Sequence, residues 1–156
     1  MSDRLKMGDS APGFRLKDQN GLPVSLSDFT GGKLLLYFYP KADTPGCTVQ
    51  ACSVRESFPA LAELGVAVVG ISPDPSDVLK AFDIGHRLGF PLLADEDHGV
   101  AEAYGVWSEK KRNDITYMGI LRSAFLIDEK GWIEALWLPV RPEEMVPQVI
   151  RKLSPG

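Results

Sequence analysis

The chain lacks the features that tie a protein to a membrane, a nucleic acid or a metal. Its 156 residues include only two cysteines and two histidines, no cluster of basic residues and no apolar run of about 18 residues. With a net charge of −4 and no basic cluster, the sequence predicts no basic surface that would attract nucleic acid or an anionic membrane. We therefore expect small-molecule substrates. The polar start of the chain, Met1 to Lys6, has no signal-type apolar region and predicts a cytoplasmic protein.

The sequence also lacks repeats, low-complexity segments and any linker that would separate two units. Its length matches one domain and is sufficient to bury a core. We expect residues 1–156 to form a single domain.

The two cysteines are Cys47 and Cys52, five residues apart and directly after the apolar run Leu34 to Tyr39. Thr44 followed by Pro45 predicts the N-cap and the first position of a helix, which places Cys47 in the first helical turn. The unpaired backbone N–H groups and the positive end of the helix dipole favour a thiolate there. This arrangement indicates thiol redox chemistry.

In a continuous helix the Cα atoms of Cys47 and Cys52 lie roughly 8–9 Å apart. Disulfide-bonded Cα atoms usually lie about 4.4–6.8 Å apart, so a bond between them requires the helix to unwind locally. Such a bond would act as a switch, because a loop this short stabilises a fold very little. Alternative interpretations are a structural disulfide, two inert buried thiols, or a metal site. The metal site is disfavoured because His86 and His98 lack ligand spacing to the cysteines.

The hydrophobic pattern predicts alternating strands and helices. Pro59 is expected to kink or interrupt the first long helix, and Pro147 either begins or kinks the last one. The expected elements are a hairpin of 13–16 and 22–26, a strand over 33–39, a helix over 45–64, a strand over 66–72, a helix over 76–88, a strand over 90–94, a helix over 97–104, a polar loop over 107–118, a hairpin of 122–127 and 133–138, and a helix within 143–153.

This order predicts an α/β protein with a thioredoxin-like fold: a mixed central β-sheet flanked by helices, with an N-terminal β-hairpin. The cysteine-bearing helix begins at the carboxyl end of a strand, where open α/β sheets place their binding sites.

The segment from Tyr37 to Cys52 closely resembles the active-site segment of the peroxiredoxins, specifically the bacterioferritin comigratory protein or PrxQ type. The family pattern Pro-x-x-x-Thr-x-x-Cys falls on Pro40, Thr44 and Cys47, and the resolving cysteine of this subtype falls on Cys52. The segments 8–14, 90–95 and 122–128 resemble the opening, middle and arginine-bearing parts of the same family. The resemblance covers essentially the whole chain.

The resemblance implies a thiol-dependent peroxidase that reduces hydrogen peroxide and organic hydroperoxides and serves antioxidant defence. Cys47 would be the peroxidatic cysteine and become a sulfenic acid, and Cys52 would resolve it as an intramolecular disulfide. Thioredoxin or a similar dithiol would restore the thiols. No cofactor or metal is implied, and a monomer suffices because both cysteines lie in one chain.

The resemblance also assigns roles to Arg122 and Thr44, which with the backbone N–H groups of Gly46 and Cys47 would bind the peroxide, and to Pro40, which would shield the thiolate. Each has a structural alternative: an N-cap for Thr44, a strand terminator for Pro40 and a surface arginine for Arg122.

Two other functions compete. A general thiol-disulfide oxidoreductase normally has Cys-x-x-Cys spacing, and a redox sensor would lack peroxidase turnover.

Overall fold

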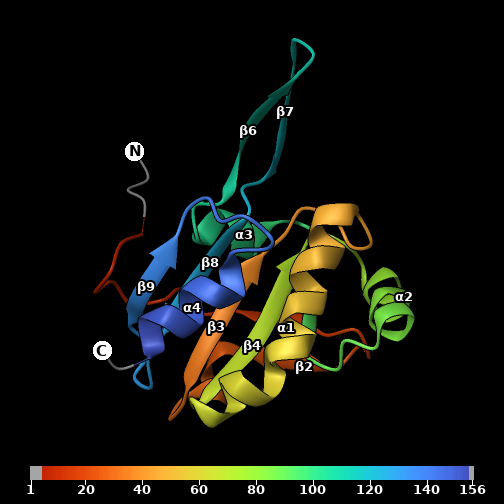
Figure 1. Ribbon diagram of the computed structural model, residues 1–156. Coiled ribbons are helices and arrows are strands. Elements are labelled where there is room, and N and C mark those ends of the chain that lie inside the picture. The colour runs from red at the N-terminus through yellow and green to blue at the C-terminus, as the bar shows by residue number, and fades with distance from the viewer. Residues whose placement is uncertain (1–4, 155–156) are drawn as a thin grey trace.

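The computed structural model describes residues 5–154 and is built around a central β-sheet (Figure 1). In chain order its elements are β1 (Arg15–Lys17), β2 (Pro23–Ser25), the 3₁₀ helix η1 (Leu26–Phe29), β3 (Lys33–Phe38), α1 (Pro45–Glu63), β4 (Val66–Ser72), α2 (Ser76–His86), β5 (Leu92–Ala94), α3 (Gly99–Ala103), β6 (Trp107–Arg112), β7 (Ile115–Ile120), β8 (Ser123–Ile127), β9 (Ile133–Trp137) and α4 (Met145–Leu153).

The central sheet has seven strands in the order β2-β1-β5-β4-β3-β8-β9. Strands β3, β4 and β5 run parallel, and β8 and β9 continue the sheet antiparallel. At the other edge, β1 and β2 form the expected N-terminal hairpin, with Arg15 opposite Ser25. The predicted mixed sheet is therefore confirmed.

The central strand β3 supplies both hydrophobic cores, because successive side chains of a strand point to opposite faces of the sheet. Leu35 and Tyr37 join the core beneath α1, α2 and α4. Leu34, Leu36 and Phe38 join the core on the opposite face, together with residues of α3. Helices thus cover both faces of the sheet (Figure 1).

The first long helix, α1, runs unbroken through Pro59, so of the two outcomes expected there, a kink or an interruption, the interruption is wrong. Pro59 is exposed, and Leu61, two residues further on, is fully buried in the core. The packing of Leu61 holds the last turn in place despite the backbone hydrogen bond that Pro59 cannot donate. The helix ends before Gly65, which has a φ of +75° as expected for a residue that follows a helix.

The last helix, α4, begins at Met145, and Pro147 is its third residue. A proline is tolerated in the first turn, where backbone N–H groups have no partner within the helix. Pro147 therefore lies in the first turn, two residues after the helix begins. Helix α2 ends at His86, two residues earlier than predicted, because Arg87 adopts the left-handed conformation with a φ of +51°.

The polar segment predicted as a loop forms a second β-hairpin, so that prediction is wrong. Strands β6 and β7 pair antiparallel from Trp107 opposite Ile120 to Arg112 opposite Ile115, and the hairpin projects from the body of the protein (Figure 1). Asn113 and Asp114 connect them with φ values of +51° and +66°. Asn and Asp tolerate this conformation, which a tight hairpin turn requires at both positions.

No helix within residues 5–154 has the length and apolarity needed to cross a membrane.

One close approach in the core yields a stability prediction. A Cβ built on Gly70 of β4 would lie 2.9 Å from Cζ of the buried Tyr37 ring on the neighbouring strand. Gly70→Ala should therefore lower the free energy of unfolding by about 1–3 kcal/mol, as is usual for overpacking. Urea unfolding of the reduced protein would measure this.

Gly85→Ala provides the control, because Gly85 lies in α2 and a Cβ there meets nothing within 4 Å. This variant should be as stable as the parent or slightly more stable. Equal stability of the two variants would contradict the proposed contact between Gly70 and Tyr37.

Candidate active site

Cys47 lies in the first turn of α1, where the chain has just left the carboxyl end of β3 (Figure 1). The first backbone hydrogen bond of the helix runs from Thr48 N to the Thr44 carbonyl at 2.8 Å. The N–H groups of Gly46 and Cys47 precede this bond and therefore have no partner within the helix. The Cys47 side chain is 1% exposed and belongs to the core beneath α1.

Cys52 lies on the same unbroken helix and is partly buried against that core. Both cysteines are free thiols. In this helical form the two sulfurs face different directions, since five residues correspond to about 140° of rotation around the helix axis. The sequence-based expectation that a disulfide requires local unwinding therefore applies to this structure.

Arg122 reaches the start of α1 because β8 runs antiparallel to β3. The pairing places Ser123 opposite Phe38, so Arg122 lies just beyond the carboxyl end of β3. A Cβ built on Gly46 would lie 3.1 Å from Nη2 of Arg122 and 3.4 Å from Pro142. The absence of a side chain at Gly46 thus allows the guanidinium to lie against the helix terminus that carries Cys47.

Gln50 holds the arginine in place and was missed from the sequence. Nη1 of Arg122 donates to Oε1 of Gln50 at 2.7 Å, and Nε2 of Gln50 donates to the Met145 sulfur at 3.1 Å. Gln50 is fully buried. The available signal was its spacing, because a residue three positions after Cys47 lies on the same face of the helix.

Thr44 occupies the predicted N-cap position, but its side chain does not cap the helix. The hydroxyl instead donates to the Lys41 carbonyl at 2.8 Å. The preceding loop is fastened at two further points: Ala42 N donates to Asp74 at 2.7 Å, and the Asp43 carboxylate pairs with His86 at 3.0 Å. These contacts hold the loop before α1 against the β4–α2 region.

A groove of about 560 Å³ lies beside this helix terminus. Pro40, Thr44, Gly46 and Arg122 form one side of it, which brings four of the sequence-predicted site residues to one place. The β6–β7 hairpin forms the other side. That side contributes the cationic residues Lys110 and Arg112 and the largely apolar residues Trp107, Tyr117, Met118 and Ile120.

Three buried hydroxyl groups have no hydrogen-bond partner among the described residues, those of Tyr37, Tyr39 and Ser123. Tyr37 belongs to the same core as Cys47, and Ser123 directly follows Arg122. Burial raises the pKa of Tyr37 well above its usual value, so this hydroxyl remains protonated. Its chemistry is therefore limited to hydrogen bonding.

Both histidines have a carboxylate partner. His86 pairs with Asp43, and His98 pairs with Glu102 at 3.2 Å and stacks on Trp107. Over residues 5–154 there is no group of three or more His, Cys, Asp or Glu side chains placed to hold a metal ion.

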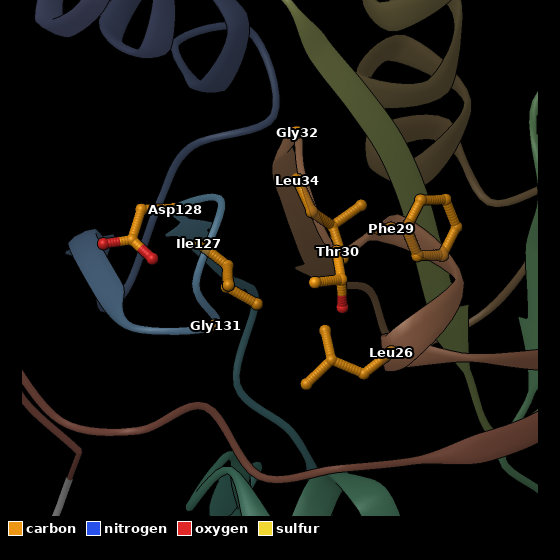
Figure 2. A pocket seen from close by; sticks show the side chains of 8 residues that line it. All are labelled: Leu26, Phe29, Thr30, Gly32, Leu34, Ile127, Asp128 and Gly131. Atoms are coloured by element: carbon orange, nitrogen blue, oxygen red, sulfur yellow. The ribbon is translucent and has the colours of Figure 1, made fainter.

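A second, much smaller cavity lies at the opposite end of β3 and β8 (Figure 2). Its volume is about 20 Å³, and its lining is mainly apolar. Asp128 stands at its edge, but its carboxylate accepts hydrogen bonds from the N–H groups of Lys130 and Trp132, both at 2.9 Å. This carboxylate stabilises the β8–β9 turn and is not available for chemistry in the cavity.

Comparison with known proteins agrees with the resemblance found in the sequence. Residues 7–136 match the model of the AhpC/TSA family. Peroxiredoxin Bcp of Escherichia coli is 54% identical over 130 residues, which cover 83% of each chain.

Solved structures also match this fold closely. Peroxidoxin BcpB from Mycobacterium tuberculosis has a TM-score of 0.86 and 32% identity, covering 96% of this chain and 97% of that one. A structure from work on the alkyl peroxide reduction activity of the Xanthomonas campestris bacterioferritin comigratory protein has a TM-score of 0.85 and 28% identity, covering 90% and 89%.

The bond between Arg122 and Gln50 yields a prediction. Gln50→Leu removes the acceptor that fixes the guanidinium, so Cys47 should react with hydrogen peroxide about 10–100-fold more slowly. Gln50→Glu keeps an acceptor for Arg122 and should retain more of the rate. Stopped-flow measurement of Cys47 oxidation would compare the three proteins, and an unchanged rate in Gln50→Leu would show that Arg122 does not depend on this contact.

Proposed function

Because this chain belongs to the AhpC/TSA family and is a peroxiredoxin of the Bcp and PrxQ type, a thiol-dependent peroxidase, we propose that Cys47 is its peroxidatic cysteine and Cys52 its resolving cysteine. One observation carries this assignment. Cys47 lies in the first turn of a helix whose Gly46 is in contact range of the Arg122 guanidinium. The helix terminus that carries Cys47 and a fixed cation thereby lie at the same groove, which Gly46 and Arg122 line, while the side chain of Cys47, the residue after Gly46, is buried.

In the first step the Cys47 thiolate attacks the terminal oxygen of a hydroperoxide. A sulfur–oxygen bond forms, the oxygen–oxygen bond breaks, and its electron pair leaves on an alkoxide or hydroxide. That anion takes up a proton and departs as an alcohol or water, while Cys47 becomes a sulfenic acid. Sulfur is oxidised by two electrons, and the peroxide is reduced by two.

Activation of the sulfur alone cannot make this step fast. For a generic thiol, lowering the pKa from about 8.5 to about 6 raises the thiolate fraction at neutral pH about thirtyfold but costs about tenfold in nucleophilicity. The larger contribution must come from donors aimed at the negative charge on the departing oxygen.

Arg122 and the backbone N–H groups of Gly46 and Cys47 are the donors in this proposal. Arginine keeps its charge and presents several donors in fixed geometry, and Gln50 holds it through one nitrogen while Nη2 remains near Gly46. Thr44 can contribute by turning its hydroxyl from the Lys41 carbonyl towards the peroxide. Pro40 supplies a rigid apolar surface at the same groove, which limits access of water to the thiolate.

In the second step Cys52 attacks the sulfenic acid, a disulfide forms and water leaves. The first turns of α1 must unwind for this, which removes Cys47, Gln50 and Ala51 from the core. Arg55 anchors the following part of α1 to α2, because its Nη1 donates to the His86 carbonyl at 2.6 Å. The helix beyond Arg55 can stay docked while the preceding turns open.

A dithiol reductant then restores both thiols, and thioredoxin fits this role. Both cysteines lie in one chain, so the cycle can be completed by a monomer. We also propose that the protein works in the cytoplasm, where a reducing environment keeps cysteine pairs as thiols between catalytic cycles. The substrates in this proposal are hydrogen peroxide and organic hydroperoxides, in line with the alkyl peroxide reduction named for the Xanthomonas campestris relative.

Intact-mass spectrometry tests the cycle directly. After one equivalent of hydrogen peroxide, the reduced parent protein should lose two hydrogens as the disulfide forms. Cys52→Ser should instead gain oxygen, because its sulfenic acid has no partner, and Cys47→Ser should stay unchanged.

Turnover with thioredoxin provides the companion measurement. Cys52→Ser should consume about one equivalent of peroxide and then stop or overoxidise. Undiminished turnover of this variant would rule out the resolving role of Cys52, and an unreactive Cys47 in the parent would rule out the peroxidatic role.

A further inference from the structure

The groove beside Cys47 is cationic, although the chain as a whole is acidic. Four basic side chains line it, those of Lys41, Lys110, Arg112 and Arg122, and no carboxylate among the described residues does. The whole chain has 21 acidic and 17 basic residues, so this concentration of positive charge departs from the average surface. The proposed reaction uses Arg122 alone and leaves the other three without a role.

Lys110 is the best placed of the three. It lies on β6 opposite Tyr117, and its stem lies across Gly119, where an added Cβ would be 3.3 Å from Cδ of the lysine. Because Gly119 has no side chain, the stem can pack flat on the hairpin, and Lys110 is only partly exposed. Burial, followed by the positive charge of Arg122, lowers the pKa of Lys110.

No carboxylate of the described residues pairs with Lys110, and Cys47 is the neighbour that acts to raise its pKa. Among residues 5–154, no carboxylate lies within 4.0 Å of its ammonium group. A partly buried cation without a partner, in a groove shared with the reactive site, is well suited to bind an anionic group of a ligand.

The rest of the hairpin wall is suited to an apolar ligand body. Trp107 and Ile120 form the base of this wall, and Tyr117 and Met118 are 44% and 50% exposed beside Lys110. An apolar surface next to an unpaired cation matches a molecule that carries a negative charge on a hydrophobic body. Hydrogen peroxide is too small to contact both.

We infer that this groove selects organic hydroperoxides that carry a carboxylate on an apolar body, and that Lys110 is the residue that recognises the carboxylate. The inference rests on the proposed function, since the peroxide end of the substrate must reach Cys47. The peroxide would lie at Gly46 and Arg122, the apolar body along the hairpin, and the carboxylate at the Lys110 ammonium.

The test compares three oxidants in single-turnover oxidation of Cys47: cumene hydroperoxide, the same compound with a para-carboxylate, and hydrogen peroxide. The parent protein should prefer the carboxylate over cumene hydroperoxide, and salt should weaken this preference. Lys110→Met keeps the stem over Gly119 and removes the charge. This variant should lower the rate of Cys47 oxidation by the carboxylate compound about tenfold, the size expected for one charge-assisted hydrogen bond. The rates with cumene hydroperoxide and hydrogen peroxide should stay within about twofold of the parent.

Two variants complete the design. Lys110→Arg should restore most of the preference. Lys111→Met is the matched control, because Lys111 is the next residue of β6, is exposed and does not line the groove.

Equal slowing of all three oxidants in Lys110→Met would overturn the inference, because it would mean a general effect on the Cys47 thiolate. Unchanged rates would overturn it as well. A defect confined to turnover with thioredoxin would assign this wall to the reductant instead. Failure of the proposed function would look different, since the parent protein would then react with none of the three oxidants.

Discussion

The antiparallel pairing of β8 with β3 is the constraint on which this site depends. Cys47 and Arg122 are 75 positions apart in the sequence. The register that places Ser123 opposite Phe38 brings Arg122 to the carboxyl end of β3, where α1 begins. A shift of one residue would turn every side chain of β8 to the other face, and the buried residues of that strand exclude such a shift. The hydrophobic core therefore fixes the position of Arg122.

Helix α1 has two requirements that oppose each other. Its first turn must hold Cys47 beside Arg122, and this is achieved by burial of Cys47, Gln50 and Ala51 and by the bond from Gln50 to Arg122. In the proposed cycle the same turns must then open so that Cys52 can reach the oxidised sulfur. Gln50 connects the two requirements, because opening the helix separates it from both Arg122 and Met145. The contacts that position the arginine are thus the contacts that oppose disulfide formation.

Much of this architecture could be predicted from local patterns. The apolar run of β3, the Thr44-Pro45 helix start and the N-terminal hairpin are each specified by a few neighbouring residues, and each prediction is confirmed. The β6–β7 hairpin was not predicted from the sequence, because its strands are polar and largely exposed and lack the hydrophobic alternation typical of a strand. Gln50 was not predicted either, because its partners Arg122 and Met145 are distant in the sequence. Lys110 was not predicted because its position depends on Gly119 of the neighbouring strand and on the groove.

The unpaired hydroxyl of Tyr37 has a consequence for the balance between the helical and the unwound form of α1 in the proposed cycle. A buried polar group without a partner costs about 1–3 kcal/mol relative to its hydrated state. Tyr37 belongs to the core beneath α1, so any water admitted when the first turns of that helix open recovers some of that cost. The reduced form is consequently less stable at this point than an ideally packed core would be. A core without this hydroxyl would be more stable and would oppose the opening of α1 more strongly.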